Sequence, residues 1–113
     1  KADALGQERL KIVAYDLMVF LKSRIDKRNI PDFLVHDGVF HAISYRTISN
    51  VLNYMYHKSN ELHNFQYIVT FNEDEIDLNG DESKFGKFDF DWSKQVIAEY
   101  SDTEQETIFK RFF

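Results

Sequence analysis

The sequence has no cysteine, a single proline and only four glycines. Without cysteine the chain forms neither a disulfide framework nor a thiolate metal site, which suits a cytoplasmic protein. No apolar run reaches the roughly 18 residues of a membrane-spanning helix, and no signal peptide is visible, so we expect no membrane segment. Acidic residues also outnumber basic ones, which gives a net charge of −5. The chain as a whole therefore attracts neither nucleic acid nor anionic lipid.

The size and composition of the chain are those of one folded domain. Its 113 residues are near the usual length of a single domain, and 43% of them are hydrophobic, which suffices for a buried core. This composition excludes a disordered tail as the main state of the chain. We expect a single domain over residues 1–113. Because the sequence opens at Lys1 without a methionine, we also expect a fragment of a longer protein.

Hydrophobic spacing predicts two long helices. Apolar residues three and four apart predict one helix over residues 7–27, ended by the Asn29-Ile-Pro31 stretch, and a second over residues 44–63. The first helix also carries apolar residues outside its main stripe, namely Ile12, Tyr15, Met18 and Val19. We therefore expect the first helix to be buried on more than one face.

Two short runs rich in β-branched and aromatic residues predict strands over residues 32–36 and 65–71. A connection of this length, containing a helix, is typical of a parallel βαβ crossover. The expected fold class is α/β, with a partial parallel sheet. Because both runs are continuously apolar, we expect the sheet to be covered on both faces.

The last third of the chain has a different character. Residues 73–92 are acidic and rich in turn-forming residues, which predicts a surface loop. Residues 95–101 and 106–113, separated by a polar turn, predict a C-terminal β-hairpin. Ile108 and Phe109 are adjacent, so the last strand does not alternate cleanly, and a terminal helix is an open alternative.

The stretch "FLVHDG" ends the first strand with an ionisable pair. Ligands of open α/β sheets bind beyond the carboxyl ends of parallel strands, where Asp37 and, on the next strand, Asn72 are expected. One well-placed carboxylate suffices for a Mg²⁺ ion that keeps its waters. The alternative is that Asp37 only caps the turn or the following helix. His36 should point to the opposite face of the strand, where a hydrogen-bonded packing role is expected.

The start of the first helix is a second candidate site. Gly6 precedes the predicted helix, and the free N–H groups of a helix start, with the helix dipole, favour an anion. Arg9 and Lys11 add positive charge nearby, and Glu8 offsets part of it.

In chain order these parts are "LGQERLKIVAYDL", "FLVHDG", a long helix and "FQYIVTFNEDE". This order resembles the C-terminal lobe of ABC-type ATPases of the SMC/RecN class, and more closely a poorly characterised bacterial family in which such a lobe closes a coiled-coil ATPase. The resemblance implies that Gly6 and Gln7 match the end of the signature motif, which contacts the γ-phosphate held by the opposite protomer. It implies that Asp37 matches the Walker B aspartate, which holds Mg²⁺ through water, and that Asn72 stands near the switch histidine.

The chain departs from the pattern of that class at several positions. The signature serine is Ala4, the catalytic glutamate is Gly38, and residues 42–46 lack the D-loop aspartate. Asn72 can hydrogen-bond a phosphate but cannot carry a proton. No GxxxxGK[ST] loop is present anywhere in the sequence. These departures put hydrolysis in doubt rather than the fold.

The resemblance implies a nucleotide-binding half-site. Mg·ATP would bind only in the assembled parent protein, so no cofactor and no enzymatic activity are expected of this chain alone. The implied partners are an N-terminal Walker A lobe of the same parent, joined through a coiled coil, and a second copy in a homodimer. A DNA-acting parent is expected by family analogy, without support from this acidic chain. The alternative is a protein–protein interaction or structural domain without a nucleotide role, suggested by the aromatic residues and the apolar tail "IFKRFF".

Overall fold

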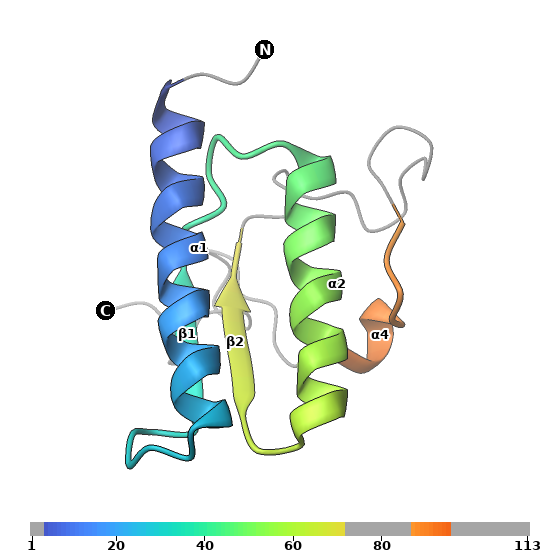
Figure 1. Cartoon of the computed structure of the whole chain (residues 1–113). Helices are drawn as coiled ribbons and strands as arrows, with labels where there is room; N and C mark the ends of the chain where they lie inside the picture. The colour runs from blue at the N-terminus through green and yellow to red at the C-terminus, as the bar shows by residue number, and fades with distance from the viewer. Residues whose placement is uncertain (1–3, 72–86, 96–113) are drawn as a thin grey trace, which may run out of the picture.

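The computed structural model describes residues 4–71 and 87–95, which form a mixed α/β fold (Figure 1). The elements are, in chain order, α1 (Ala4–Ile25), β1 (Phe33–Asp37), α2 (Tyr45–Leu62), β2 (Gln66–Thr70) and the short α4 (Trp92–Gln95). The two predicted helices and two predicted strands are confirmed, with ends shifted by a few residues. In the described ranges no helix combines the length and apolarity that a membrane crossing requires.

The two strands pair in parallel, as the crossover length predicted. Phe33 lies opposite Gln66 at one end of the sheet, and Asp37 lies opposite Thr70 at the other. Helix α2 connects the strands, so β1, α2 and β2 form a βαβ unit. Both carboxyl ends therefore lie at the same edge of the sheet.

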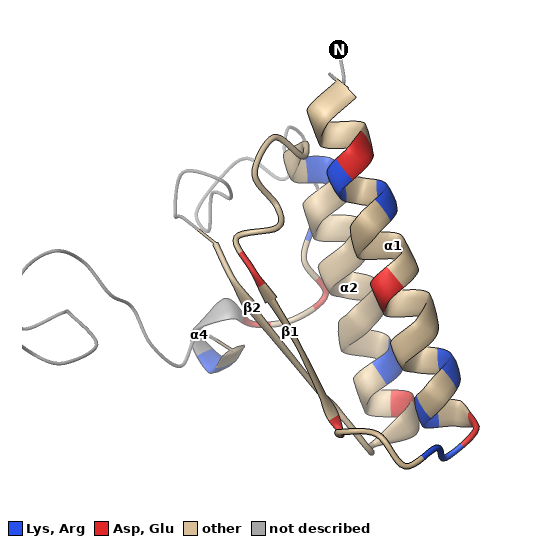
Figure 2. Cartoon of the chain, turned by 90° about the vertical axis from the view of Figure 1, so that its left-hand side faces the viewer, with Lys and Arg blue, Asp and Glu red and all other residues tan. Residues whose placement is uncertain are grey.

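Both long helices cover the same face of the sheet (Figure 2). Leu34 and Tyr67 point to this face and pack against the core, whereas Phe33, Val35 and Ile68 on the alternate positions are 38% to 49% exposed. The expectation of a sheet covered on both faces is not met within the described residues. The reason is that the helix before β1 and the crossover helix lie on one side.

The core lies between this face of the sheet and the two helices. Side chains of α1 and α2 interlock there with one aromatic ring from the loop after β1. The buried apolar residues are Val13, Leu17, Phe20, Leu21, Phe40, Ile48, Leu52 and Met55. This packing fixes how the helix starts sit relative to the strand ends.

Helix α1 ends earlier than predicted, and without the help of proline. Lys27 has a left-handed backbone with φ 54°, and its N–H bonds the carbonyl of Arg24 at 3.2 Å. The N–H of Arg28 bonds the carbonyl of Ser23 at 2.9 Å. This pair of bonds is a Schellman motif, which ends the helix before Pro31 is reached.

Helix α2 has a capping residue at each end. The Ser44 side chain accepts a hydrogen bond from the N–H of Thr47 at 3.3 Å. His63 takes the left-handed conformation, and its N–H bonds the carbonyl of Ser59 at 2.9 Å. The predicted range of residues 44–63 thus included both caps.

Residues 87–91, at the end of the predicted acidic loop, are docked on α2. The Asn53 amide donates to the carbonyl of Lys87 at 2.7 Å and accepts from the N–H of Asp89 at 2.8 Å. His57 Nε2 lies 2.8 Å from a carboxylate oxygen of Asp89. The loop is therefore anchored at this end by side chains of the crossover helix.

Only Gln95 of the predicted C-terminal hairpin lies within the described residues. Gln95, which was to open the first strand of the hairpin, is the last residue of α4. Trp92, assigned to the loop, opens that helix. The rest of the hairpin, residues 96–113, and residues 72–86 of the loop region lie outside the described residues.

Candidate functional site

The carboxyl ends of the two strands form a small polar cluster. The Thr70 hydroxyl donates a short hydrogen bond to the Asp37 carboxylate. The N–H of Gly38 donates to the Thr70 hydroxyl oxygen at 3.2 Å and lies 3.3 Å from the Thr70 carbonyl oxygen. These bonds fix an exposed carboxylate at the strand end. A carboxylate held in this way can bind a hydrated Mg²⁺ ion through its waters.

Gly38 turns the chain directly after this carboxylate. Its φ is +68°, in the left-handed region, and a Cβ added there would meet no atom within 4 Å. Glycine is thus favoured at this position by backbone conformation rather than by lack of space. The same conformation disfavours a glutamate at this position.

Helix α1 starts earlier in the sequence than predicted. The helix begins at Ala4, so Gly6 is inside its first turn and does not precede it. Gly6 is buried and Gln7 is exposed. Both residues still belong to the first turn of the helix. This turn itself contains no acidic residue, and Asp3 and Glu8 flank it in the sequence.

The helix start and the strand ends lie at the same end of the molecule. Figures 1 and 2 both show α1 running against the direction of the strands, with its N-terminal turns extending beyond the strand ends where Asp37 and Thr70 lie. Helix α2 begins at this end as well. Two helices therefore begin on the side of the fold where the strands end.

The remaining predicted residue, Asn72, lies outside the described residues, so its role as a phosphate sensor stays a prediction. Among residues 4–71 and 87–95, no three His, Asp or Glu side chains converge to hold a metal ion. A cation at Asp37 would therefore keep most of its water ligands or take further ligands from another chain.

His36 points away from Asp37, as the alternation of the strand predicted. It is 4% exposed and connects three elements. Its Nε2 lies 3.0 Å from a carboxylate oxygen of Asp16 on α1, and its Nδ1 lies 2.7 Å from the hydroxyl of Tyr67 on β2. Since a carboxylate only accepts, the contacts fit a ring that donates from Nε2 to Asp16 and accepts from the tyrosine hydroxyl at Nδ1. The predicted hydrogen-bonded packing role is thus what the contacts show.

Tyr67 is the most perturbed titratable group in the described part of the chain. Burial raises its pKa well above the ordinary value, and the nearby Asp16 carboxylate raises that pKa further. Both effects disfavour the phenolate. The tyrosine therefore keeps its proton for the bond to His36 throughout the physiological pH range.

Sequence reasoning missed three residues of these clusters: Thr70, Asp16 and Tyr67. The parallel register could have identified Thr70, because it pairs directly with Asp37. Tyr67 lies diagonally near His36 on the helix-facing side, but no sequence signal marks its hydroxyl as a partner. Asp16 comes from a different element, and only the packing of α1 over the sheet brings it to His36.

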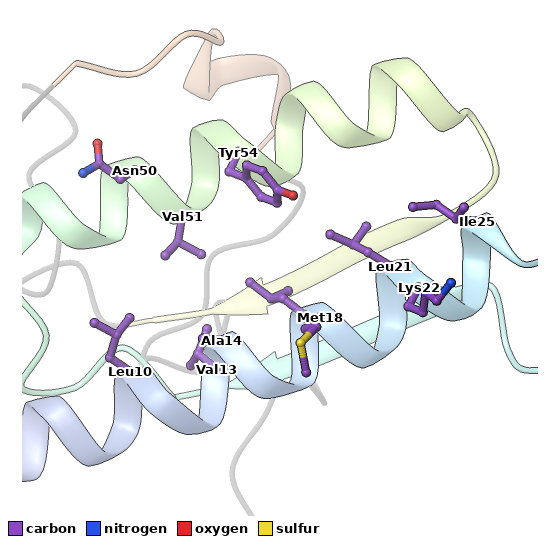
Figure 3. Close-up of a pocket in the computed structure, with 11 residues that line it drawn as sticks. Leu10, Val13, Ala14, Met18, Leu21, Lys22, Ile25, Asn50, Val51 and Tyr54 are labelled. Atoms are coloured by element: carbon purple, nitrogen blue, oxygen red, sulfur yellow. The ribbon is translucent and has the colours of Figure 1, made fainter.

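An apolar groove of about 510 Å³ runs between α1 and α2 (Figure 3). Met18 and Ile25 of α1 and Tyr54 of α2 line it, together with other apolar side chains. Lys22 and Asn50 supply its strongly polar groups. A small-molecule site normally has several convergent polar groups that orient the ligand. Because this groove lacks such groups, we describe it as an apolar groove between the helices and not as a small-molecule site.

Comparison with known proteins gives one match. A profile of the family described as "Uncharacterised protein conserved in bacteria (DUF2326)" matches residues 1–113, the whole chain. Searches of curated proteins and of solved structures give no match. Since the profile spans the full length of the sequence, the chain belongs to this bacterial family of uncharacterised function, DUF2326.

Proposed function

We propose that the chain is the C-terminal lobe of an SMC/RecN-like ATPase and contributes Mg·ATP-sensing and closure elements to a shared nucleotide site. In this role Asp37 holds Mg²⁺ through water, and the start of α1 at Gly6 and Gln7 closes over the γ-phosphate held by the opposite protomer. Asn72 contacts the phosphate. The phosphate-cradling loop and its lysine come from a separate N-terminal lobe of the parent, which acts as a cytoplasmic homodimer.

One observation carries the proposal. The exposed Asp37 carboxylate, held by the Thr70 hydroxyl, stands at the carboxyl end of β1, and α1 begins on the same side of the fold. A Mg²⁺–phosphate group needs a carboxylate for the cation and N–H groups for the anion. A nucleotide site at the carboxyl ends of parallel strands is also where open α/β sheets bind ligands.

The proposal concerns binding and sensing rather than hydrolysis by this chain. Gly38 stands where a general base would follow the aspartate, and its left-handed backbone disfavours a glutamate. Any base that activates water in the parent must therefore come from another position. The chain alone should show neither ATPase activity nor appreciable ATP affinity.

The test measures ATP binding with and without the N-terminal Walker A lobe. Mg·ATP should bind the two lobes together and not this chain alone. Asp37→Asn should weaken that binding at least about tenfold, the lower end for groups that orient a metal site. Asp32→Asn, the same charge change just before the opposite end of β1, is the matched control and should bind like wild type. Equal affinity of the Asp37→Asn and Asp32→Asn pairs would refute the assignment.

A second candidate function is a protein-interaction domain without nucleotide. Exposed apolar side chains favour it, since they run along α1 and over the open face of the sheet. Their position does not separate the two candidates, because Val35 lies near Asp37 while most of the others lie on α1. If Mg·ATP fails to bind any assembly of the chain with its parent's other parts, the interaction role stands alone.

A further inference from the structure

The outer side of α1 is unusually apolar for a solvent-exposed helix face. Six of its large apolar residues are 44% to 63% exposed, namely Leu5, Ile12, Tyr15, Met18, Val19 and Ile25. Figure 2 shows the sheet on one side of the helix layer and no described element beyond the other side. A helix that packs on one core is normally polar on its far side. The outer side of α1 therefore has the composition of a contact surface.

The charged residues of this surface follow a pattern. Residues seven apart lie almost in line along a helix. Glu8, Tyr15 and Lys22 form the central line, opposite the buried Val13. The flanking lines are Leu5, Ile12 and Val19 on one side and Lys11, Met18 and Ile25 on the other. The central line thus has an acid and a base at equal distances on either side of a tyrosine.

We propose that this surface binds a second copy of the chain, with the two α1 helices antiparallel about a twofold axis at Tyr15. In this arrangement Glu8 lies level with Lys22 of the partner subunit, twice by symmetry, and the two Tyr15 rings meet at the axis. On one flank Ile12 lies against Val19 of the partner subunit. The surface is therefore complementary to itself in charge and in apolar contacts.

The charges select the antiparallel arrangement. A parallel pair would place Glu8 beside Glu8 and Lys22 beside Lys22, which repels at both ends. Within one helix Glu8 is 3.8 Å from Lys11, and Lys22 is 3.2 Å from Asp26. Because these pairs are exposed and weak, they leave both groups available to a partner. The antiparallel contact extends each pair into a network across the interface.

This dimer does not rest on the proposed nucleotide role. It uses the outer side of α1, whereas the nucleotide site would use the helix start and the strand ends, so it should form without ATP or Mg²⁺. A single pair of helices is at the small end of specific interfaces, which bury about 1,200 Å² or more. We therefore expect a dissociation constant on the order of micromolar.

The first test is sedimentation equilibrium of the 113-residue chain without nucleotide. The wild-type chain should be a dimer at high concentration. Glu8→Lys and Lys22→Glu should each weaken the dimer at least about tenfold, since each places two pairs of like charges in contact. The double variant should recover most of the lost affinity. Glu61→Lys on α2 is the matched control, because Glu61 is likewise exposed and three residues from a lysine partner. It should dimerise like wild type.

The second test uses the lack of cysteine. Tyr15→Cys puts one thiol on the twofold axis and should give a disulfide-linked dimer under mild oxidation. Lys22→Cys should not link to itself, because the two thiols would be ~21 Å apart along the helices. A monomeric wild-type chain with native circular dichroism would overturn the proposal. So would failure of the double charge reversal to restore the dimer, or self-linkage of Lys22→Cys, which indicates a parallel pair.

Discussion

Replacing His36 with alanine should be among the most destabilising single changes in the described part of the chain. The ring is 4% exposed and joins α1, β1 and β2 through Asp16 and Tyr67. Its loss removes two hydrogen bonds, each contributing about 1 kcal/mol, and leaves the buried Tyr67 hydroxyl without its partner, which costs about 1 kcal/mol more. The Asp16 carboxylate is 40% exposed and can be hydrated instead, so it adds little.

The expected loss for His36→Ala is therefore about 3 kcal/mol of unfolding free energy. Single domains are stable by only about 5–15 kcal/mol, so this loss should be plain in urea denaturation followed by far-ultraviolet circular dichroism. Asp16→Asn keeps an oxygen that accepts from Nε2 and should cost under about 1 kcal/mol. Tyr67→Phe should cost about 1 kcal/mol, and its effect should not add to that of His36→Ala, because both changes break the same bond.

A loss of less than about 1 kcal/mol for His36→Ala, the value of a single ordinary hydrogen bond, would contradict a joining role for this ring. That role would also be refuted if Asp16→Asn cost as much as His36→Ala. Additive effects of the His36 and Tyr67 changes would show that the bond between them is not energetically coupled.

Three further predictions concern separate parts of the fold. Because folding raises the pKa of Tyr67, the tyrosine's contribution to stability is present below its unfolded pKa of about 10 and falls as pH rises above that value. Tyr67→Phe should therefore flatten this part of the stability–pH curve relative to wild type. An unchanged slope in the variant would contradict this prediction. Gly38→Ala should cost about 1 kcal/mol through its left-handed backbone alone, and a stabilised variant in thermal melts would disprove that reading. Asn53→Ala should release the segment of Lys87 and Asp89 from α2, seen as faster amide hydrogen exchange at Asp89, while equal exchange would show that other contacts hold it.

Local sequence signals determined much of the fold. The spacing of apolar residues located α2, and the length of the crossover predicted the parallel strands. Strand alternation alone predicted that His36 and Asp37 lie on opposite faces of the sheet, because successive side chains of a strand point in opposite directions. These features depend on neighbouring residues, so a single sequence contains them.

Other features depend on contacts that no local pattern records. The end of α1 rests on Lys27 in a left-handed conformation that is typical of glycine, so the later Pro31 was a misleading signal. The link between Asp16 and His36 requires α1 to lie over the sheet. The continuous apolar character of the strands predicted two covered faces, whereas the described helices cover one. The exposed face of the sheet and the outer side of α1 were therefore not foreseen as surfaces.

The effect of Mg²⁺ on ATP affinity in the complex with the Walker A lobe shows directly whether Asp37 places Mg²⁺ in a shared nucleotide site. The ratio of ATP affinities in Mg²⁺ and in EDTA should be large for the wild-type complex and should fall towards one for Asp37→Asn. The same ratio for both complexes would show that the carboxylate at the end of β1 takes no part in binding the cation.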